Sequence, residues 1–306
     1  MTTGKVIVEV PATSANMGPG FDVLGLALDI YNTVEMAVLP DEGLVIEATG
    51  EGAKLLHRTG SRLLVDAAMR VFSASGIDPP GLFIRQHTRI PVFSGLGSSA
   101  AAIVGGMVAA NSLLAEPLPP DKLLDLAAEM EGHPDNVAPA LFGGLVAACR
   151  TDDGVKHVRI QPPASLLVVV VAPDFQLPTK RSRDALPATV SFEDAVFNLG
   201  RTALLIAAMF SGDANQLSWA MEDRLHQPYR SKLVPGLEDV IAAAKDAGAL
   251  ATVLSGAGPA VISFMTGNRK AVGQAMKEGF LRHGVTSRIM EAAVSGRGAL
   301  SSVKNY

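Results

Sequence analysis

A short glycine-rich segment in the first half of the chain constrains the fold more than any other feature. A strand-like run over residues 82–90 leads into it, and an apolar run rich in alanine continues from it to about residue 115. This order predicts a strand, a tight turn and a helix. Gly95 and Gly97 remove side chains where a backbone bends sharply or approaches a ligand. The helix that follows directs unpaired N–H groups and its positive dipole end at the turn, which predicts an anion site, most naturally for phosphate.

Two common phosphate-binding motifs do not describe this segment. The Walker motif needs a lysine directly after its second glycine, and the chain has no lysine over residues 55–121. The pattern Gly95-x-Gly97-x-x-Ala100 formally fits a dinucleotide fingerprint. The acid that should follow a second strand is Glu116, however, and it stands at the end of the predicted helix. A packing turn between touching helices also explains the small residues, so the segment alone leaves both interpretations open.

The composition favours a globular protein with a substantial core. Of the 306 residues, 48% are hydrophobic and 18% are charged, which argues against disorder. The net charge is −4 and acidic and basic residues are interspersed, so no basic face for nucleic acid is expected. No apolar run is long enough to span a bilayer, and the N-terminal residues alternate like a strand without a signal-peptide core. We therefore expect a cytoplasmic protein with no nucleic-acid or membrane partner.

Cysteine usage agrees with that expectation. Cys149 is the only cysteine, so the chain can form no internal disulfide, which fits a reducing compartment. It ends a short apolar run. We therefore expect a buried small hydrophobic residue and not a nucleophile.

Periodicity along the chain predicts two α+β regions. Runs with helical spacing and runs typical of strands follow one another without a sustained βαβ rhythm. The segment Gln161-Pro-Pro163 is the best candidate boundary, so domains are expected over residues 1–163 and 164–306. The expected helices cover residues 62–75, 121–131 (capped by Asp121), 192–210, 237–247 and 269–283, and the expected strands of the second half cover residues 166–172, 249–254, 260–264 and 286–290.

Three further segments make the glycine-rich turn specific. They are Pro11-Ala-Thr-Ser-Ala-Asn-Met-Gly-Pro-Gly-Phe-Asp22, Glu131-Gly-His-Pro-Asp-Asn136 and Leu254-Ser-Gly-Ala-Gly-Pro259. With Gly95-Leu-Gly-Ser-Ser99 they resemble, in the same order along the chain, the kinase superfamily of galactokinase, homoserine kinase, mevalonate kinase and phosphomevalonate kinase (GHMP). The resemblance runs from about residue 5 to residue 290. The first segment resembles the homoserine kinases in particular, since relatives acting on sugars and mevalonate carry a different sequence there.

The resemblance implies a two-domain GHMP-kinase fold of the α+β class. The N-terminal, ATP-binding domain is similar to the second domain of ribosomal protein S5, the C-terminal domain is a ferredoxin-like sandwich, and the active site lies in the cleft between them. The ATP phosphates are expected on the glycine-rich segment, which comprises Pro91, Val92, Phe93, Ser94, Gly95, Leu96, Gly97, Ser98, Ser99, Ala100 and Ala101. A second layer, which approaches the phosphates or props this loop, is expected from Ser255, Gly256 and Gly258. A plain hairpin turn there stays open as an alternative.

The resemblance also places a Mg²⁺ ion at Ser99 and Glu131. Mg²⁺ prefers oxygen ligands, and it needs few from the protein when phosphates and water supply the others. Without the motif, Glu131 would be interpreted as a solvated acid at the end of a helix. Asn32 and residues 55–63 are the candidates for the adenine pocket.

Homoserine, the acceptor that the resemblance implies, carries an ammonium, a carboxylate and a primary hydroxyl group. The positions that match the amino-acid site of the family are Asn16, Asp22, Asp135, Arg183 and Arg230. Asp22 and Asp135 are expected to pair with the ammonium, and Asn16 to hold a polar end. Either arginine could hold the carboxylate with two hydrogen bonds, which a lysine would do less well.

Asp135, Asn136 and Glu131 are the expected catalytic residues, but the sequence identifies no general base. Mevalonate kinase relatives place an aspartate where Asn136 stands, and an amide cannot take a proton at neutral pH. We therefore expect positioning and charge stabilisation to carry the reaction, with the hydroxyl proton leaving to solvent or phosphate. His133 and His226 are expected to shape their loops.

The function expected from the resemblance is ATP-dependent phosphorylation of L-homoserine to O-phospho-L-homoserine, with release of ADP, in threonine biosynthesis. Two alternatives stay open. One is a kinase of the same superfamily with another alcohol acceptor, against which Asn16 and Asp22 argue. The other is a catalytically silent sensor of nucleotide or amino acid. Ser99, Glu131 and Asp135 argue against it, because a sensor need not keep a metal and an acceptor set together. The same resemblance makes a homodimer plausible.

Overall fold

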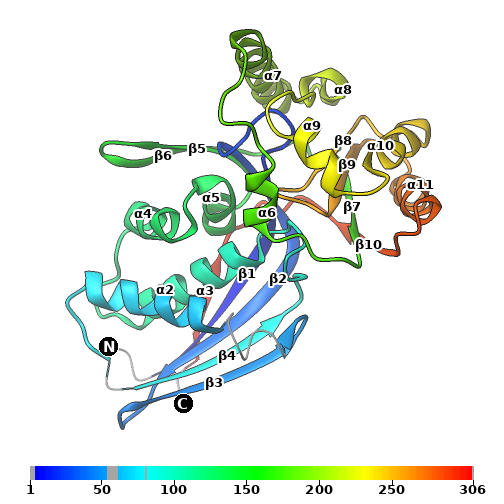
Figure 1. Ribbon diagram of the computed structural model, residues 1–306. Helices are drawn as coiled ribbons and strands as arrows, with labels where there is room; N and C mark the ends of the chain where they lie inside the picture. Colours follow the sequence, from blue (N-terminus) through cyan, green and yellow to red (C-terminus); the bar gives the residue numbers. More distant parts are fainter. Residues whose placement is uncertain (1–3, 54–60, 80, 305–306) are drawn as a thin grey trace.

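The computed structural model describes residues 4–53, 61–79 and 81–304, and within them two β-sheets carry the helices (Figure 1). The larger sheet has seven strands: β1 Lys5–Ala15, β2 Leu24–Val38, β3 Gly43–Gly50, β4 Gly81–Thr88, β5 Leu145–Thr151, β6 Gly154–Ile160 and β11 Leu300–Lys304. β1 lies between β11 and β2, β4 and β3 follow β2, and the β5–β6 hairpin pairs with the start of β2. The β3–β4 pair is parallel, and helix α2 (Ser61–Ala74) lies in the crossover between these strands.

Helix α3 (Ser98–Leu113) lies at the centre of the first half. Its side chains are apolar on all sides and mostly buried, because it packs on β1 and β2 and also against α2 and α4 (Pro120–Glu131). Gly106 permits the close approach to α2, since a Cβ there would lie 2.3 Å from the carbonyl oxygen of Leu64. The small residues after the glycine-rich turn therefore do serve helix packing. Each fully buried Ile or Met side chain in this layer stabilises the fold by about 1.5–3 kcal/mol.

The smaller sheet has the strand order β10–β7–β9–β8 and is antiparallel throughout. Its strands are β7 Leu167–Pro173, β8 Ala251–Leu254, β9 Val261–Met265 and β10 Ser287–Ala292. Helices α10 (Leu237–Asp246) and α11 (Arg269–Arg282) form one apolar cluster with Val169 and Val171 of β7. Val168 and Val170, on the opposite face, belong to the main core. The β-α-β-β-α-β order confirms the expected ferredoxin-like arrangement, and burial of both faces explains the unbroken valine run.

Four helices between β7 and α10 complete the second half. They are α6 Thr179–Asp184, α7 Phe192–Ser211, α8 Leu217–Ala220 and α9 Gln227–Arg230. In Figure 1, α7 and α8 lie at the upper margin of the molecule, whereas α6 and α9 lie toward its centre, between the two sheets. In the described part of the chain, no helix has both the length and the apolar character needed to cross a membrane.

The two helices around the segment 131–136 differ from the sequence-based expectation. Helix α5 (Pro134–Phe142) was not expected, because Pro134 and Pro139 lower the helix propensity of this segment. Pro134 is tolerated because it occupies the first turn, where its missing N–H would have had no helical partner. Helix α4 begins at Pro120, so Asp121 lies in the first turn and is not the cap.

The β5–β6 hairpin and the last strand bring two further findings. Cys149 is exposed and not buried, because it lies toward the end of β5, opposite Lys156, where the hairpin leaves the core. Strand β11 pairs with β1, so that Lys304 stands opposite Lys5. Residues 300–304 therefore join the sheet of the first half, and the division after residue 163 stays a prediction.

Candidate active site

A cavity of about 280 Å³ opens where the glycine-rich segment, the start of α5 and segments of the second half meet. The predicted residues in its wall are Asn16, Asp22, Val92, Phe93, Ser94, Gly95, Gly97, Ser98, Ser99, Glu131, Asp135, Asn136, Arg183, Arg230 and Gly256. The predicted residues outside the wall are Pro91, Leu96, Ala100, Ala101, Ser255 and Gly258. The fold thus brings the four motif segments, which are far apart in the sequence, to one cavity.

The glycine-rich segment has the geometry of a turn that ends in a free helix start. Gly95 and Gly97 both have positive φ, 85° and 68°. A Cβ on Gly95 would lie 2.2 Å from the carbonyl oxygen of Ser255, and one on Gly97 would lie 1.9 Å from Oγ1 of Thr13, so no other residue fits either place. Gly97 precedes α3, and no side chain caps that helix. The first N–H groups of α3 therefore face the cavity edge as donors for an anion.

The second glycine loop, residues 255–258, props this turn. The Ser255 hydroxyl donates to the carbonyl oxygen of Gly95 at 2.7 Å. The carbonyl oxygen of Gly256 accepts from Nδ2 of Asn16 at 3.0 Å and from Nη1 of Arg230 at 3.0 Å. Oδ1 of Asn16 in turn accepts the backbone N–H of Asp22 at 3.1 Å. The Asn16 amide is therefore occupied at both ends and shapes the loop that carries Asp22.

Ser99 and Glu131 meet at the cavity wall. The Ser99 hydroxyl donates to Oε1 of Glu131 at 2.7 Å. Burial raises the pKa of Glu131 above its ordinary value, and the Ser99 hydrogen bond and the charge of His133 offset this only in part. In the described residues, no lysine or arginine forms an ion pair with Glu131. A buried carboxylate and a hydroxyl that converge on a cavity are a donor set that fits Mg²⁺.

Asp135, at the start of α5, is buried and bonded to two neighbours. Its Oδ1 lies 2.5 Å from Nδ1 of His133 and accepts from Nδ2 of Asn136 at 3.3 Å. Oδ1 of Asn136 accepts from the Thr13 hydroxyl at 2.8 Å, so this amide orients Asp135 and has no free end. Burial lowers the pKa of His133, but Asp135 and Glu131 outweigh that effect, and the net pKa is raised. His133 therefore remains an imidazolium, paired with the Asp135 carboxylate, to a higher pH than an isolated histidine would.

The two predicted arginines differ in their partners. Arg183 forms two hydrogen bonds with the carboxylate of Asp22, at 2.6 and 3.0 Å, so each already neutralises the other. Arg230 is 2% exposed and donates to the carbonyl oxygens of Ser182 and Gly256. Within the described chain it forms no ion pair with a carboxylate. Burial, followed by repulsion from Arg183, lowers the pKa of Arg230 to about 10.

A buried guanidinium without an anionic partner is costly, because its hydration is lost and no opposite charge replaces it. Arg230 remains charged at neutral pH, since its lowered pKa of about 10 is still well above 7. It lies in the cavity wall, near Asp135 and Asp22. This part of the cavity therefore offers an anion subsite beside acidic groups, which suits a small zwitterion.

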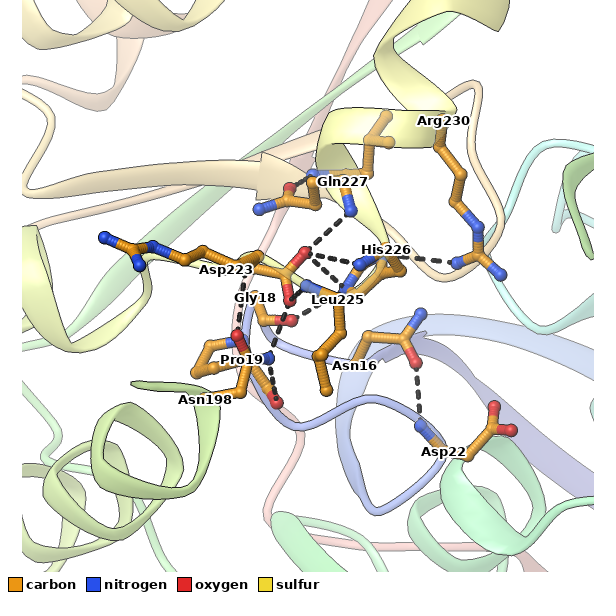
Figure 2. A network of polar contacts seen from close by, with 12 residues as sticks. Asn16, Gly18, Pro19, Asp22, Asn198, Asp223, Leu225, His226, Gln227 and Arg230 are labelled. Carbon is orange, nitrogen blue, oxygen red and sulfur yellow. Dashed lines mark hydrogen bonds and ion pairs between the residues drawn. The ribbon is translucent and has the colours of Figure 1, made fainter. Parts of the chain in front are cut away.

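A network of polar contacts around His226 and Asp223 supports the side chain of Arg230 (Figure 2). Asp223 is fully buried and accepts three successive backbone N–H groups at the start of α9, together with Nδ2 of Asn198 at 2.7 Å. Nε2 of His226 lies 2.7 Å from the carbonyl oxygen of Gly18, and its Nδ1 lies 3.4 Å from Nη1 of Arg230. The network joins α7, α9 and the first motif loop behind the cavity.

The sequence analysis singled out Arg230 and His226 in this network, but it missed Asp223 and Asn198. Asp223 precedes α9 by a few residues, an acid before a helix start, which is a signal that could have marked it. Ala257, which lies inside the second glycine-rich motif, and Thr179 also line the cavity, although neither was assigned a role. Of the adenine candidates, Leu63 lies in the wall and residues 55–60 fall outside the described ranges. Asn32 is buried elsewhere, where its Oδ1 accepts two backbone N–H groups.

Comparison with known families agrees with both halves of the chain. The N-terminal domain family of the GHMP kinases matches residues 62–144, and the C-terminal family of the GHMP kinases matches residues 204–281. The first match contains the glycine-rich segment, α4 and α5. The second contains α9 and the second glycine loop.

Individual relatives are similar over nearly the whole chain. Homoserine kinase of Moorella thermoacetica is 47% identical over 294 residues, covering 96% of this chain and 99% of the relative. Homoserine kinase of Carboxydothermus hydrogenoformans is 48% identical over 301 residues, covering 98% of each. The crystal structure of homoserine kinase from Cytophaga hutchinsonii superposes with a TM-score of 0.89 at 33% identity, over 99% of this chain and 98% of that one.

Proposed function

This chain belongs to the homoserine kinase family of the GHMP kinases, and we propose that it transfers the γ-phosphoryl group of ATP to the side-chain hydroxyl of L-homoserine. The products are O-phospho-L-homoserine and ADP, in a step of threonine biosynthesis. One observation carries the choice of acceptor. Arg230, which is buried and forms no ion pair within the described residues, shares a cavity with acidic groups and with the start of α3.

The glycine-rich segment supplies the donor half of the site. Its backbone N–H groups and the start of α3 hold the triphosphate, a task for which no lysine is needed. Ser99 and Glu131 would hold the Mg²⁺ ion with their oxygen atoms. When bound, the ion neutralises charge on the phosphate oxygens during transfer. Glycine at residues 95 and 97 keeps the backbone free to approach the phosphates.

The second half of the chain supplies the acceptor subsite. Arg230 takes the carboxylate of homoserine, which gives the buried guanidinium the anion it lacks. Asp135 and Asp22 line the same cavity and are the acidic groups for the ammonium. Arg183 keeps Asp22 in place through its two hydrogen bonds. With both charged ends held, the hydroxyl of homoserine reaches toward the glycine-rich segment.

Positioning carries the chemical step in this proposal. Both ends of the Asn136 amide are occupied, and Oδ1 of Asp135 is shared with His133 and Asn136. Asp135 therefore orients the acceptor, and the hydroxyl proton leaves to solvent or to the transferred phosphate. Replacement of Asp135 by asparagine distinguishes an orienting role from that of a general base. If the variant binds homoserine normally but does not phosphorylate it, Asp135 is the base.

A panel of acceptors tests the proposal. Purified protein with Mg-ATP is offered L-homoserine, mevalonate, galactose and L-threonine, and ADP release is measured. We expect turnover with L-homoserine to exceed that with each other acceptor by at least about 100-fold, because only homoserine satisfies the charged groups and also presents a primary hydroxyl. Preferential turnover of mevalonate or galactose would assign another acceptor. Nucleotide binding without turnover of any acceptor would make the chain a sensor.

A further inference from the structure

The loop between β1 and β2, residues 16–23, belongs to the first half of the chain but is held by the second half. The carbonyl oxygen of Pro19 accepts from Nδ2 of Asn198 on α7 at 3.1 Å. The carbonyl oxygen of Gly18 lies 2.7 Å from Nε2 of His226, just before α9. The acidic end of the acceptor site, which this loop carries, is therefore placed by contacts with the second half.

The conformation of the β1–β2 loop needs that support. Asn16, Met17 and Asp22 have positive φ values of 70°, 50° and 58°. A left-handed backbone is unfavourable for residues other than glycine, and it persists where the surrounding structure imposes it. A contact that fixes this loop therefore also fixes the carboxylate of Asp22.

His226 lies between the β1–β2 loop and Arg230 (Figure 2). Its side chain is fully buried. Nε2 of the ring contacts the carbonyl oxygen of Gly18, and Nδ1 lies 3.4 Å from Nη1 of Arg230. One ring thus contacts both the loop that carries Asp22 and the guanidinium that the proposed function assigns to the carboxylate of the acceptor.

The partners of the ring determine which nitrogen carries the proton. The carbonyl oxygen of Gly18 can only accept, and so can the carboxylate of Asp223, 3.5 Å from Nε2, so Nε2 is protonated. Nη1 of Arg230 can only donate, so Nδ1 is unprotonated. Burial and the charge of Arg230 lower the pKa of His226 more than the charge of Asp223 raises it. The ring is therefore a neutral imidazole at neutral pH, a donor on one side and an acceptor on the other.

Phe21, also in the β1–β2 loop, packs against the same groups. Its ring centroid lies 5.3 Å from that of His226 and 5.2 Å from Cζ of Arg230. Cζ of Arg183, which pairs with Asp22, lies 5.5 Å from the same centroid. The face of an aromatic ring attracts a cation, so Phe21 keeps both guanidinium groups close to the loop.

We infer that His226 is a positioning residue that sets the spacing between the two charged ends of the acceptor site. The inference rests on the proposed function, in which Asp22 attracts the ammonium of homoserine and Arg230 takes its carboxylate. Both groups of an α-amino acid are bonded to one carbon atom, so the site must present its acid and its arginine at one separation. The imidazole fixes that separation because it bonds to the loop of Asp22 with one nitrogen and to Arg230 with the other.

Fixed charged ends also select one stereoisomer of the acceptor. The ammonium, the carboxylate and the hydroxyl-bearing chain of homoserine extend from the same carbon atom. When the first two groups are held in place, only one mirror image directs its hydroxyl at the glycine-rich segment. A loosened contact at either charged end lets the other mirror image turn its hydroxyl to the same place. Preference for L-homoserine over D-homoserine therefore reports on the spacing that His226 sets.

Kinetics with both enantiomers tests the inference. We expect His226→Ala to raise the KM for L-homoserine about 10-fold and to change the KM for ATP little. We also expect the ratio of kcat/KM for L-homoserine to that for D-homoserine to fall by at least about 5-fold. A variant that is merely less stable contains less active enzyme, which lowers the rates with both enantiomers and leaves their ratio unchanged.

Two further variants separate the two contacts of the ring and retain a polar side chain. In His226→Gln the amide N–H stands near the place of Nε2 and can donate to Gly18. In His226→Asn the carbonyl oxygen stands near the place of Nδ1 and can accept from Arg230. We expect each variant to recover part of the KM for L-homoserine, and neither to recover the full preference for the L enantiomer.

Thr202→Val is the matched control. The Thr202 hydroxyl donates to the carbonyl oxygen of Pro19 at 3.0 Å, so the variant removes one hydrogen bond from the same loop without touching Arg230. Asn198 still donates to that oxygen. We expect the KM for L-homoserine and the preference for it to stay within about 2-fold of the wild type.

Several results would overturn the inference. They are an unchanged KM or an unchanged enantiomer ratio in His226→Ala, a wild type that uses both enantiomers equally, a full wild-type ratio in either polar variant, and an equal fall of the ratio in Thr202→Val. Failure of the proposed function shows separately, as a wild-type chain that phosphorylates neither enantiomer of homoserine.

Discussion

Replacement of Arg230 by methionine is expected to raise the KM for L-homoserine by roughly 100-fold or more and to leave the KM for ATP nearly unchanged. Loss of one partner from a buried charged pair costs about 2–5 kcal/mol of binding free energy. Methionine keeps the length of the side chain but cannot bind a carboxylate. The donor half of the site, at the glycine-rich segment, does not depend on Arg230, so ATP should bind as before. Steady-state kinetics with each substrate varied in turn measures both values.

The same substitution should not destabilise the free protein. The guanidinium of Arg230 is buried, and within the described chain no carboxylate forms an ion pair with it. An apolar side chain of similar volume removes the cost of burying that charge, although it also removes the hydrogen bonds to Ser182 and Gly256. We therefore expect a melting temperature equal to or above that of the wild type. This pairing of lost affinity with retained stability distinguishes a binding residue from a structural one.

Arg224→Met provides the matched control. Arg224 is also an arginine of the second half, but it stacks over Phe197 at 3.9 Å and pairs with Asp194 outside the cavity. It should alter neither KM. If Arg230→Met binds homoserine as well as the wild type does, Arg230 is not part of the acceptor subsite. In that case Arg183 would have to release Asp22 to serve as the anion site.

Local constraints explain why some parts of the molecule could be predicted from the sequence. Positive φ and close contacts at Gly95 and Gly97 exclude other residues, so a two-glycine turn before an apolar run is visible in the sequence itself. Helix α7 and strand β7 were likewise evident from their apolar sequences, although the exposure of one side of α7 was not. The motif residues around Asp22 and Asp135 could be assigned only through the family resemblance.

Contacts between distant residues explain why other parts could not be predicted. Which of Arg183 and Arg230 is available to bind the carboxylate of the acceptor depends on Asp22, because Asp22 pairs with Arg183. Asp22 is 161 positions from Arg183 in the sequence. The pairing of β11 with β1 joins the two ends of the chain, and no local pattern specifies it. The support of Arg230 by His226 and Asp223 likewise exists only in the folded chain. In each case both residues could be seen in the sequence, but their contact could not.

Replacement of Glu131 by glutamine is expected to lower kcat by roughly 100- to 1,000-fold, because a neutral amide cannot hold a divalent ion as a carboxylate does. Its carbonyl oxygen can still accept from the Ser99 hydroxyl, so the local structure is kept. Glu129→Gln is the control on the same helix, since Glu129 is exposed and pairs with Arg70. It should keep full activity.

The pH dependence of stability checks the same carboxylate without any substrate. Burial raises the pKa of Glu131 above its ordinary value of 4.5, so above pH 4.5 the folded chain retains a proton that the unfolded chain loses. The stability of the wild type relative to Glu131→Gln must therefore fall as the pH rises from 4.5 through the raised pKa, and stay low above it. Urea unfolding of both proteins in metal-free buffer, at several pH values from 4.5 to 8, measures this difference. A constant difference would mean that the carboxylate is solvated, and a Glu131→Gln variant with full kcat would remove Glu131 from the metal site.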